Sequence, residues 1–354
     1  MRIRTVTMLG IALITVGACS GSAATTAPAS ASAAPASASA APASASAAPA
    51  SASAAPASAS AKNYKLTLIQ GVKGDPFYVT MGCGAQAEAT KEGATLNITG
   101  GDTWDATVQT PIVDSVTASK PDGVMIAPND GKAMFAPLKA MNDAGVKVTL
   151  VDTGLDDLSF AQSFITSDNL GGGKLAATAL AQLIGDKGTV AVISTNPGDS
   201  TVAARVKGFY DELTKNHPNI TALPIQYDKD DPTVATTITT STLAAHPDLI
   251  GIFATNVQTA EGVATGLRQA TNTSVKTIAF DAGPKQITDL NSGLVQALIA
   301  QDPYTIGVDG VQQTILALNG QPTTKAIQTD LAIITKDNVN DPAMQKFLYK
   351  ASCS

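Results

Sequence analysis

The chain has 354 residues and a formal net charge of −6, and charged residues make up only 15% of it. Lysine and arginine residues form no cluster or stripe along the sequence, so a nucleic acid is not expected as a partner. About 290 residues remain once the repetitive N-terminal part is set aside, which suits one large domain or two medium ones.

The N-terminus has the features of a targeting segment. Arg2 and Arg4 precede an apolar stretch over residues 8–16, which is too short to span a bilayer. The Val-Gly-Ala-Cys sequence that ends at Cys19 resembles a lipobox, the signal of bacterial lipoproteins. This resemblance implies that residues 1–18 are a signal peptide and that Cys19 becomes a lipid-modified N-terminus. An ordinary secretory signal that ends in small residues is the alternative.

A repetitive segment follows. Residues 27–61 consist almost entirely of alanine, serine and proline, with a proline every seven residues. This period is typical of coiled coils, but the segment has no apolar side chain larger than alanine, and a proline in each repeat interrupts a helix. We therefore interpret residues 19–62 as an extended, solvated tether. Such a spacer suits a domain that is anchored at a membrane surface.

The chain contains three cysteines, Cys19, Cys83 and Cys353. If Cys19 carries lipid, the other two remain in an oxidising compartment, where they can form a disulfide. Such a bridge would attach the C-terminal tail to the first part of the folded chain. The alternative is a buried free Cys83 and a frayed tail.

From Lys65 onward, short apolar runs alternate with helical runs. Strands are predicted at residues 65–70, 95–98, 123–127, 147–152, 163–166, 188–194, 221–227, 249–254, 276–281, 295–300 and 328–334. Helices are predicted at residues 76–92, 106–119, 131–144, 170–185, 200–216, 233–246, 257–271, 284–292 and 303–319. Most of the strands are continuous apolar runs, as in parallel sheets that are buried on both faces. Alternating strands and helices indicate an α/β fold, and about eleven strands exceed one open sheet, so we expect two lobes. The first crossing between them is expected near residues 167–169.

The loop from Gly74 to Tyr78 connects the first predicted strand to the first predicted helix. Pro76 suits the first helical turn, and Asp75 can cap it. Phe77 and Tyr78 follow directly, although aromatic residues make up only 4% of the chain. Aromatic rings stack on the C–H faces of a sugar and a carboxylate accepts hydrogen bonds from its hydroxyls, so this loop is a candidate sugar site. The simpler interpretation is a helix cap followed by two core aromatics.

Polar or aromatic residues also follow most of the other predicted strands. They are Asn129, Asp130, Asp152, Thr153, Asn196, Tyr227, Asp228, Asn256, Phe280, Asp281 and Gln301. Ligands of open α/β sheets bind beyond the carboxyl ends of the strands. A single residue of this kind is readily explained as a helix cap, but its repetition at one edge predicts a binding site.

Nine short segments, in their order and spacing, resemble the ribose-type periplasmic binding proteins, the solute receptors of bacterial ABC sugar importers. They lie at residues 75–78, 84–89, 167–169, 172–174, 204–209, 245–248, 253–256, 279–281 and 300–301. The resemblance implies two Rossmann-like lobes with parallel sheets, joined by a three-strand hinge. It implies residues 63–167 and 302–327 in lobe 1, residues 168–301 and 328–341 in lobe 2, and a tail, residues 342–354, that returns to lobe 1.

The resemblance also implies which residues bind the ligand. With their neighbours at the strand ends, they are Asp75, Phe77, Tyr78, Asp152, Thr153, Arg205, Tyr227, Asn256, Phe280, Asp281 and Gln301. Phe77 would stack on the sugar, Tyr227 corresponds to an aromatic residue of lobe 2, and the planar polar groups would each grip hydroxyls. Ala127 stands where the family has an amide and Thr153 where it has a guanidinium, so ribose is not expected to be the best ligand.

The expected function is therefore the capture of a monosaccharide between two closing lobes and its delivery to an ABC permease. We expect a monomeric, lipid-anchored protein outside the cytoplasm. No catalytic residue, metal or cofactor is expected, because the sequence has no nucleophile motif and His217 and His246 each precede a proline near a helix end. The alternative is a receptor that presents a sugar or a furanosyl autoinducer to a membrane sensor.

Overall fold

The computed structural model describes residues 63–353. The predicted signal peptide, the lipidated Cys19 and the tether of residues 19–62 lie outside the described residues. Over residues 63–353, none of the helices combines the length and the apolar character that are needed to cross a membrane.

Strands and helices alternate along the described part of the chain. The strands are β1 (Lys65–Gln70), β2 (Thr95–Gly100), β3 (Gly123–Ile126), β4 (Lys147–Val151), β5 (Phe164–Ser167), β6 (Gly188–Ser194), β7 (Ile220–Ala222), β8 (Gln226–Tyr227), β9 (Leu249–Ala254), β10 (Lys276–Phe280), β11 (Ala297–Gln301), β12 (Ala326–Thr329) and β13 (Leu331–Thr335). The helices are α1 (Pro76–Lys91), α2 (Ala106–Ser119), α3 (Phe135–Asp143), α4 (Asn169–Ile184), α5 (Ser200–Asn216), α6 (Pro232–Ala245), α7 (Val257–Gln269), α8 (Pro284–Ser292), α9 (Pro303–Leu318) and the short 3-10 helix η1 (Pro342–Phe347).

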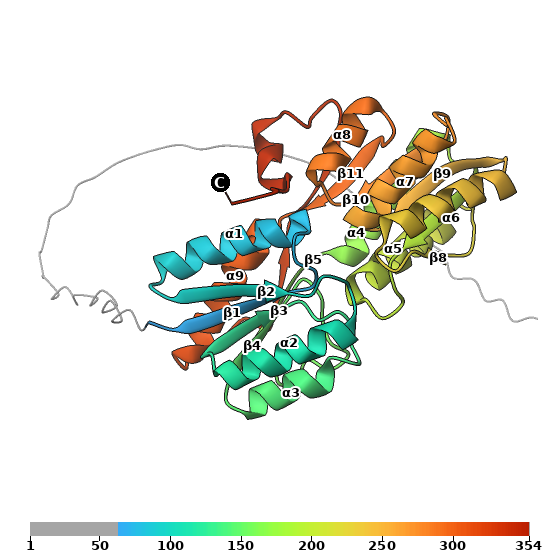
Figure 1. The fold of residues 1–354 in the computed structure, drawn as a ribbon. Coiled ribbons are helices and arrows are strands. Elements are labelled where there is room, and N and C mark those ends of the chain that lie inside the picture. The colour runs from blue at the N-terminus through green and yellow to red at the C-terminus, as the bar shows by residue number, and fades with distance from the viewer. Residues whose placement is uncertain (1–62, 354) are drawn as a thin grey trace, which may run out of the picture. The chain divides into compact units, whose positions relative to one another are not determined.

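The strands form two sheets with helices on both faces (Figure 1). The first has the order β12-β5-β4-β3-β1-β2 and is parallel throughout. The second has the order β13-β11-β10-β9-β6-β7, with β8 also paired to β6 and β13 as the antiparallel member. We call the first sheet with α1, α2, α3 and α9 lobe 1, and the second sheet with α4 to α8 lobe 2. The expected α/β fold of two lobes is confirmed.

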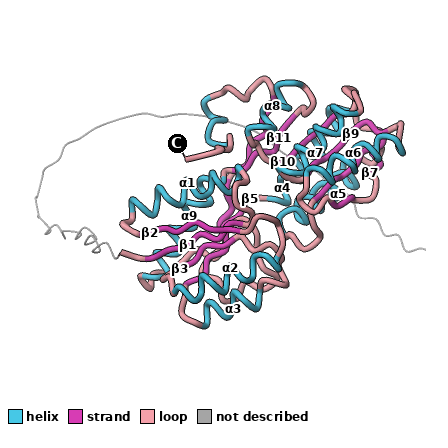
Figure 2. Tube along the Cα trace, viewed as in Figure 1, coloured by secondary structure: helices cyan, strands magenta, loops and turns pink. Residues whose placement is uncertain are grey.

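Apolar helix faces cover both sides of each sheet, which is why the central strands are apolar along their whole length. In lobe 1, α1 and α9 lie on one side of the strand layer and α2 and α3 on the other (Figure 2). Val113 of α2 and Leu138 of α3 share one buried cluster with the sheet, and Met81 of α1 and Ile306 of α9 belong to another. In lobe 2, Phe209 of α5 belongs to a cluster with α4 and the second sheet.

Two of the predicted strands are each divided in the structure. The run at 221–227 becomes β7 and β8, because Pro224 has no N–H to donate to a ladder. The run at 328–334 becomes β12 and β13, because the chain passes from one sheet to the other at Asp330. The helix predicted at 131–144 begins only at Phe135, since Asp130 Oδ1 accepts the N–H groups of the two residues after Gly131 and holds a turn there.

Three crossings join the lobes. They lie between β5 and α4, between β11 and α9, and between β12 and β13. Helix α9 packs on β3 and β4 of lobe 1, so the second crossing returns the chain to the first sheet. The expected three-strand hinge is therefore present.

The C-terminal tail follows β13 and folds back on α1. The backbone N–H of Lys350 donates to Thr80 Oγ1 at 2.7 Å. Cys83 of α1 and Cys353 form a disulfide with a Cα–Cα distance of 5.3 Å, within the usual range. The bridge joins residues 270 positions apart, and constraining so long a loop in the unfolded chain should stabilise the fold by several kcal/mol.

Candidate functional site

A cavity lies between the two lobes, at the ends of their strands. The lining residues are Val72, Asp75, Phe77, Tyr78, Trp104 and Asp152 of lobe 1, and Thr195, Asp199, Thr201, Val202, Arg205, Asp230, Asn256, Val257, Asp281 and Gln301 of lobe 2.

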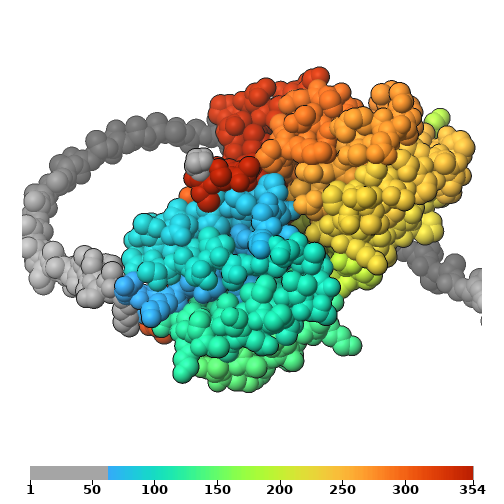
Figure 3. Space-filling view, viewed as in Figure 1, coloured from blue at the N-terminus to red at the C-terminus, as the bar shows by residue number. Residues whose placement is uncertain are grey.

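The lobes contact each other directly beside the cavity. Gln258 Nε2 of lobe 2 donates to Asp75 Oδ2 of lobe 1 at 3.4 Å. The backbone N–H of Gly154 in lobe 1 donates to Ser200 Oγ in lobe 2 at 2.9 Å. In the space-filling view, lobe 1 (blue to green) and lobe 2 (yellow to orange) meet closely (Figure 3). The structure therefore has its lobes closed over the cavity.

The start of α1 supplies an aromatic wall. Pro76 occupies the first helical position, and Asp75 Oδ1 accepts the N–H of Phe77 at 2.8 Å, so one carboxylate both caps the helix and lines the cavity. The rings of Phe77 and Tyr78 meet edge to face with centroids 5.1 Å apart. Tyr78 also stacks near Trp104 at 6.2 Å. Three rings thus face the ligand space from lobe 1.

Two carboxyl groups of lobe 1 titrate near neutral pH. Burial raises the pKa of Asp152 to about 7, although a hydrogen bond from Tyr78 Oη, 2.7 Å away, and the charge of Arg205 act against this. Burial also raises the pKa of Asp75 to about 7, and the negative charge of Asp281 adds to the effect. Both side chains can therefore be charged or neutral at the pH of most environments.

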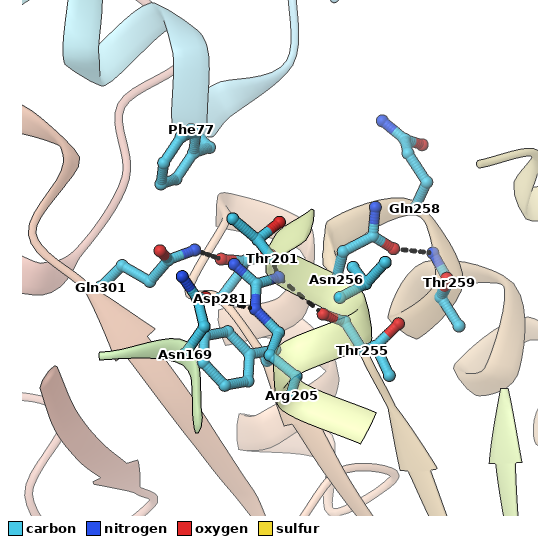
Figure 4. Close-up of polar contacts among 12 residues, drawn as sticks. Phe77, Asn169, Thr201, Arg205, Thr255, Asn256, Gln258, Thr259, Asp281 and Gln301 are labelled. Carbon is cyan, nitrogen blue, oxygen red and sulfur yellow. Dashed lines mark hydrogen bonds and ion pairs between the residues drawn. The ribbon is translucent and has the colours of Figure 1, made fainter. Parts of the chain in front are cut away.

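Arg205 of α5 is at the centre of the lobe 2 wall (Figure 4). Its Nε donates to Asn169 Oδ1 at 2.8 Å and its Nη1 donates to the carbonyl oxygen of Thr255 at 2.7 Å. The guanidinium lies over the ring of Phe280, 3.9 Å from the centroid, and Nη1 is 4.0 Å from Asp281 Oδ2. The buried cation is thus held by hydrogen bonds, a ring face and a carboxylate.

Close packing of α4 against α5 sets the position of Arg205. A Cβ at Gly173 of α4 would lie 2.0 Å from the carbonyl oxygen of Arg205, and one at Gly208 of α5 would lie 2.1 Å from that of Leu170. Only glycine permits such an approach of two helix backbones. The two glycines bring the Arg205 side chain within reach of Asn169 at the start of α4.

Hydrogen bonds within lobe 2 hold its other polar groups. Asp281 Oδ1 accepts from Gln301 Nε2 at 2.6 Å and from Tyr349 Oη at 2.8 Å. Asn256, the N-cap of α7, donates from Nδ2 to Asp230 Oδ1 at 2.6 Å. Gln301 and Asp281 appear in this arrangement below Phe77 in Figure 4. The polar wall of lobe 2 is therefore ordered by its own contacts.

The cavity is rich in hydrogen-bond acceptors. Five aspartates but one arginine are among its lining residues. Three buried atoms of the lining, Trp104 Nε1, Thr195 Oγ1 and Gln301 Oε1, have no hydrogen-bond partner among the described residues. Buried polar groups are nearly always paired, so these atoms fit a ligand whose hydroxyls both donate and accept. Within residues 63–353, His, Cys, Asp and Glu side chains form no group that could hold a metal ion.

Most of the residues expected from the sequence lie together in this cavity. The eight that line it are Asp75, Phe77, Tyr78, Asp152, Arg205, Asn256, Asp281 and Gln301. Thr153 and Phe280 do not. Thr153 is buried and donates from Oγ1 to the carbonyl oxygen of Pro128 at 2.7 Å. Phe280 lies beneath Arg205 and supports the guanidinium rather than reaching the cavity.

Tyr227, the expected lobe 2 aromatic residue, also lies away from the cavity. It ends the edge strand β8, is 42% exposed, and lines a separate hollow with Asn196 and Lys207. The chain then turns, with Asp230 at a φ of 61°, and it is the Asp230 side chain that lines the cavity. Two residues at an edge strand cannot fix which side chain of the following turn faces inward, so the sequence pattern did not indicate that Asp230 lines the cavity.

Five polar or aromatic lining residues were missed from the sequence, Trp104, Thr195, Asp199, Thr201 and Asp230. Asp199 caps α5 by accepting the N–H of Thr201 at 2.9 Å, as Asp75 caps α1. The same strand, loop, acid and helix pattern could have identified it. Trp104 is the single tryptophan of the chain, in the loop after β2, and only the fold brings it beside Tyr78.

Comparison with known proteins gives one family. The sequence model of the periplasmic binding protein domain matches residues 66–322. The ribose import binding protein of Bacillus subtilis is 27% identical over 278 residues, which cover 78% of this chain and 88% of that protein. The ribose import binding protein of Escherichia coli is 28% identical over 272 residues, which cover 77% of this chain and 90% of that protein.

Solved structures of sugar-bound solute binding proteins share the fold. An ABC transporter solute binding protein from Agrobacterium vitis, bound with alpha-D-tagatopyranose, has a TM-score of 0.79 and 39% identity, and covers 81% of this chain and 99% of its own. A carbohydrate transporter solute binding protein from Agrobacterium radiobacter, in complex with D-arabinose, has a TM-score of 0.78 and 27% identity, with coverage of 81% and 99%.

Proposed function

The chain belongs to the periplasmic binding protein family, and we propose that it captures a monosaccharide between its lobes and delivers it to an ABC importer. Family membership implies a location outside the cytoplasm. The observation that carries the proposal is the closed cavity, where three aromatic rings of lobe 1 face a hydrogen-bonded polar wall of lobe 2. Rings and planar polar groups are the two elements that sugar recognition requires.

Each wall has its own role in the proposed complex. Phe77 stacks on the C–H face of the sugar, and Trp104 Nε1 donates to one of its oxygens. Arg205 and Asp281, already close to each other, grip hydroxyls from the opposite side. Asp152, Asn256, Gln301 and the acids missed from the sequence, Asp199 and Asp230, complete the polar shell.

We propose that ribose is not the best ligand. Ala127 stands where an amide was expected and does not line the cavity, and the Thr153 hydroxyl donates to a backbone oxygen instead of reaching the ligand. Each lost hydrogen bond to a sugar hydroxyl costs about 1–3 kcal/mol, so two losses weaken ribose binding by a hundredfold or more. Asp199 and Asp230 offer acceptors at other positions, which favours a hexose or a differently substituted pentose.

A panel of sugars tests the function. Thermal unfolding is measured with D-tagatose, D-arabinose, D-fucose, D-ribose and D-glucose, followed by calorimetry on every sugar that raises the unfolding temperature. A ligand at a hundredfold excess over its Kd adds about 2.7 kcal/mol to the stability of the folded state. We expect at least one sugar to stabilise the protein more than ribose and to be recovered chemically unchanged. A panel without any stabilising sugar would contradict the proposal.

The proposal extends to the anchor. We infer a monomeric lipoprotein that is held at the cell membrane by a lipid on Cys19, because the lipobox-like sequence ends there and a spacer-like segment follows. In a lipoprotein-competent host, Cys19→Ala should release the protein from the membrane fraction. If the variant stayed in that fraction, another anchor would be required.

A further inference from the structure

The chain that follows β13, residues 336–353, includes the tail that was expected from residue 342 onward, and the whole segment is called the C-terminal tail from here on. It lies beyond the family match and contacts both lobes. Lys346 pairs with Asp302 at 3.2 Å and with Asp330 at 3.3 Å. These two acids stand at the second and third crossings of the hinge. The tail is therefore attached to the hinge before it reaches Asp281.

Tyr349 of the tail is embedded in the polar wall of lobe 2. Its side chain is buried, with 5% of the residue exposed. Its backbone N–H donates to the carbonyl oxygen of Ala282 at 3.0 Å, and its hydroxyl donates to Asp281 Oδ1 at 2.8 Å. The same hydroxyl accepts the backbone N–H of Gln301 at 3.2 Å. One phenol thus joins the ends of β10 and β11.

The next residues of the tail hold lobe 1. The Tyr349 ring meets the Phe77 ring at 5.7 Å, and the following residue donates its N–H to Thr80 Oγ1 at 2.7 Å. The disulfide from Cys353 to Cys83 then fixes the tail to α1 covalently. Tyr349 is consequently delivered to the Asp281 side chain of lobe 2 by a segment that is bound to lobe 1.

We propose that Tyr349 is a positioning residue of the sugar site and that the disulfide-bound tail acts as a strap that holds it there. The proposal rests on the proposed function. Asp281 Oδ1 receives two donors, from Gln301 and Tyr349, and this fixes the carboxylate with Oδ2 toward Arg205. Oδ2 remains for a ligand hydroxyl. Without the phenol hydroxyl, Asp281 Oδ1 keeps one donor, Gln301 Nε2, and the carboxylate rotates more freely.

The strap also makes ligand affinity depend on whether the disulfide between Cys83 and Cys353 is intact or reduced. Breaking the disulfide removes the covalent anchor beyond Lys350 and leaves Tyr349 held by hydrogen bonds and packing alone, so it is ordered less firmly before the ligand binds. Affinity should therefore fall on reduction, and in the same direction as on loss of the Tyr349 hydroxyl.

The test uses Tyr349→Phe, which keeps the ring against Phe77 and removes only the hydroxyl. The full-length protein is titrated by calorimetry with the sugar that gives the largest stabilisation in the panel, and with its series of single-deoxy analogues. We expect Kd to rise about tenfold for the sugar, the equivalent of about 1.4 kcal/mol. The analogue that lacks the hydroxyl bound by Asp281 should bind wild type and Tyr349→Phe equally, whereas the other analogues keep the difference. A merely structural role would weaken all analogues alike.

Controls separate the possible results. Tyr304→Phe, on an exposed tyrosine of α9, should leave every Kd unchanged. Cys353→Ser should weaken binding less than Tyr349→Phe, and the double variant should be no weaker than Tyr349→Phe alone, since both act through one contact.

Wild-type Kd values in Tyr349→Phe, or equal losses for all analogues, would overturn the strap while leaving the proposed function intact. If wild type bound no sugar of the panel, the proposed function and the strap would both fall.

Discussion

The two lobes correspond strand by strand, since β1, β3 and β4 of lobe 1 occupy the same sheet positions as β6, β9 and β10 of lobe 2. Aspartates also occupy equivalent positions in the two lobes. Asp75 and Asp199 cap the helices after β1 and β6. Asp152 and Asp281 follow β4 and β10, with φ values of 62° and 77°. Residues other than glycine adopt such φ values uncommonly, and here they occur at both equivalent strand ends beside the cavity.

The walls nevertheless differ in kind. Lobe 1 presents the rings of Phe77, Tyr78 and Trp104, whereas burial raises the pKa values of aspartates in both walls. Lobe 2 presents an arginine and side-chain amides that are hydrogen-bonded within the lobe. The same strand order thus carries a stacking surface in lobe 1 and a polar network in lobe 2. This is possible because the fold sets where the strand ends lie but not which side chains stand there.

The largest effect is expected from breaking the polar network of lobe 2. Asp281→Ala leaves Arg205 buried in the closed cavity without its neighbouring carboxylate, which costs about 3–5 kcal/mol. Sugar binding should weaken by more than about a hundredfold in calorimetry. The matched control is Asp289→Ala, which removes a buried acid that pairs with Arg268 outside the cavity and should leave Kd unchanged. If Asp281→Ala bound the sugar with wild-type affinity, Asp281 would not be a ligand-binding residue.

A second test concerns the buried carboxyl group of lobe 1. The pKa of Asp152 is about 7 in the folded protein and near its ordinary value of 3.8 when unfolded. Between these values the folded state binds more protons than the unfolded one, so this group lowers stability as pH rises from about 4 to about 7. Asp152→Asn removes that dependence. Without ligand, the unfolding temperature of Asp152→Asn minus that of wild type should therefore become more positive as the pH rises through this window. A difference that stayed constant with pH would contradict the expectation.

The stacking surface is tested by Phe77→Leu, which keeps an apolar side chain but removes the ring. Aromatic stacking contributes about 0.5–1.5 kcal/mol beyond simple burial, so we expect Kd to rise by up to about tenfold. Phe135→Leu is the control, since Phe135 packs on Phe160 in lobe 1 and does not line the cavity. Equal affinities of the two variants would show that Phe77 supplies no stacking.

The smallest effect is expected at Tyr227. Because this side chain is exposed and lines a separate hollow, Tyr227→Ala should change Kd by less than about twofold. A tenfold increase in Kd, measured by calorimetry, would show instead that Tyr227 contacts the ligand. Lobe 2 would then supply an aromatic ring as lobe 1 does.

Much of this arrangement could be predicted from local patterns. Continuous apolar runs such as residues 249–253 indicated buried parallel strands, and Asp75 with Pro76 indicated a helix start at the end of a strand. Both inferences rest on interactions within a few residues, where hydrogen bonding and burial leave few alternatives. Polar and aromatic residues after successive strands gave seven of the eight expected residues that line the cavity, and the family resemblance gave the eighth, Arg205.

Tertiary structure alone decided the remaining positions. The division of the run 328–334 into two strands depends on a passage between sheets, which no periodicity encodes. Asp230, rather than Tyr227, lines the cavity because of a turn beyond an edge strand. Tyr349 reaches Asp281 across 68 residues because the tail is fixed to α1. Such contacts are set by the packing of distant segments against one another, whereas the sequence by itself determined the elements, their order and the edge at which a ligand site had to lie.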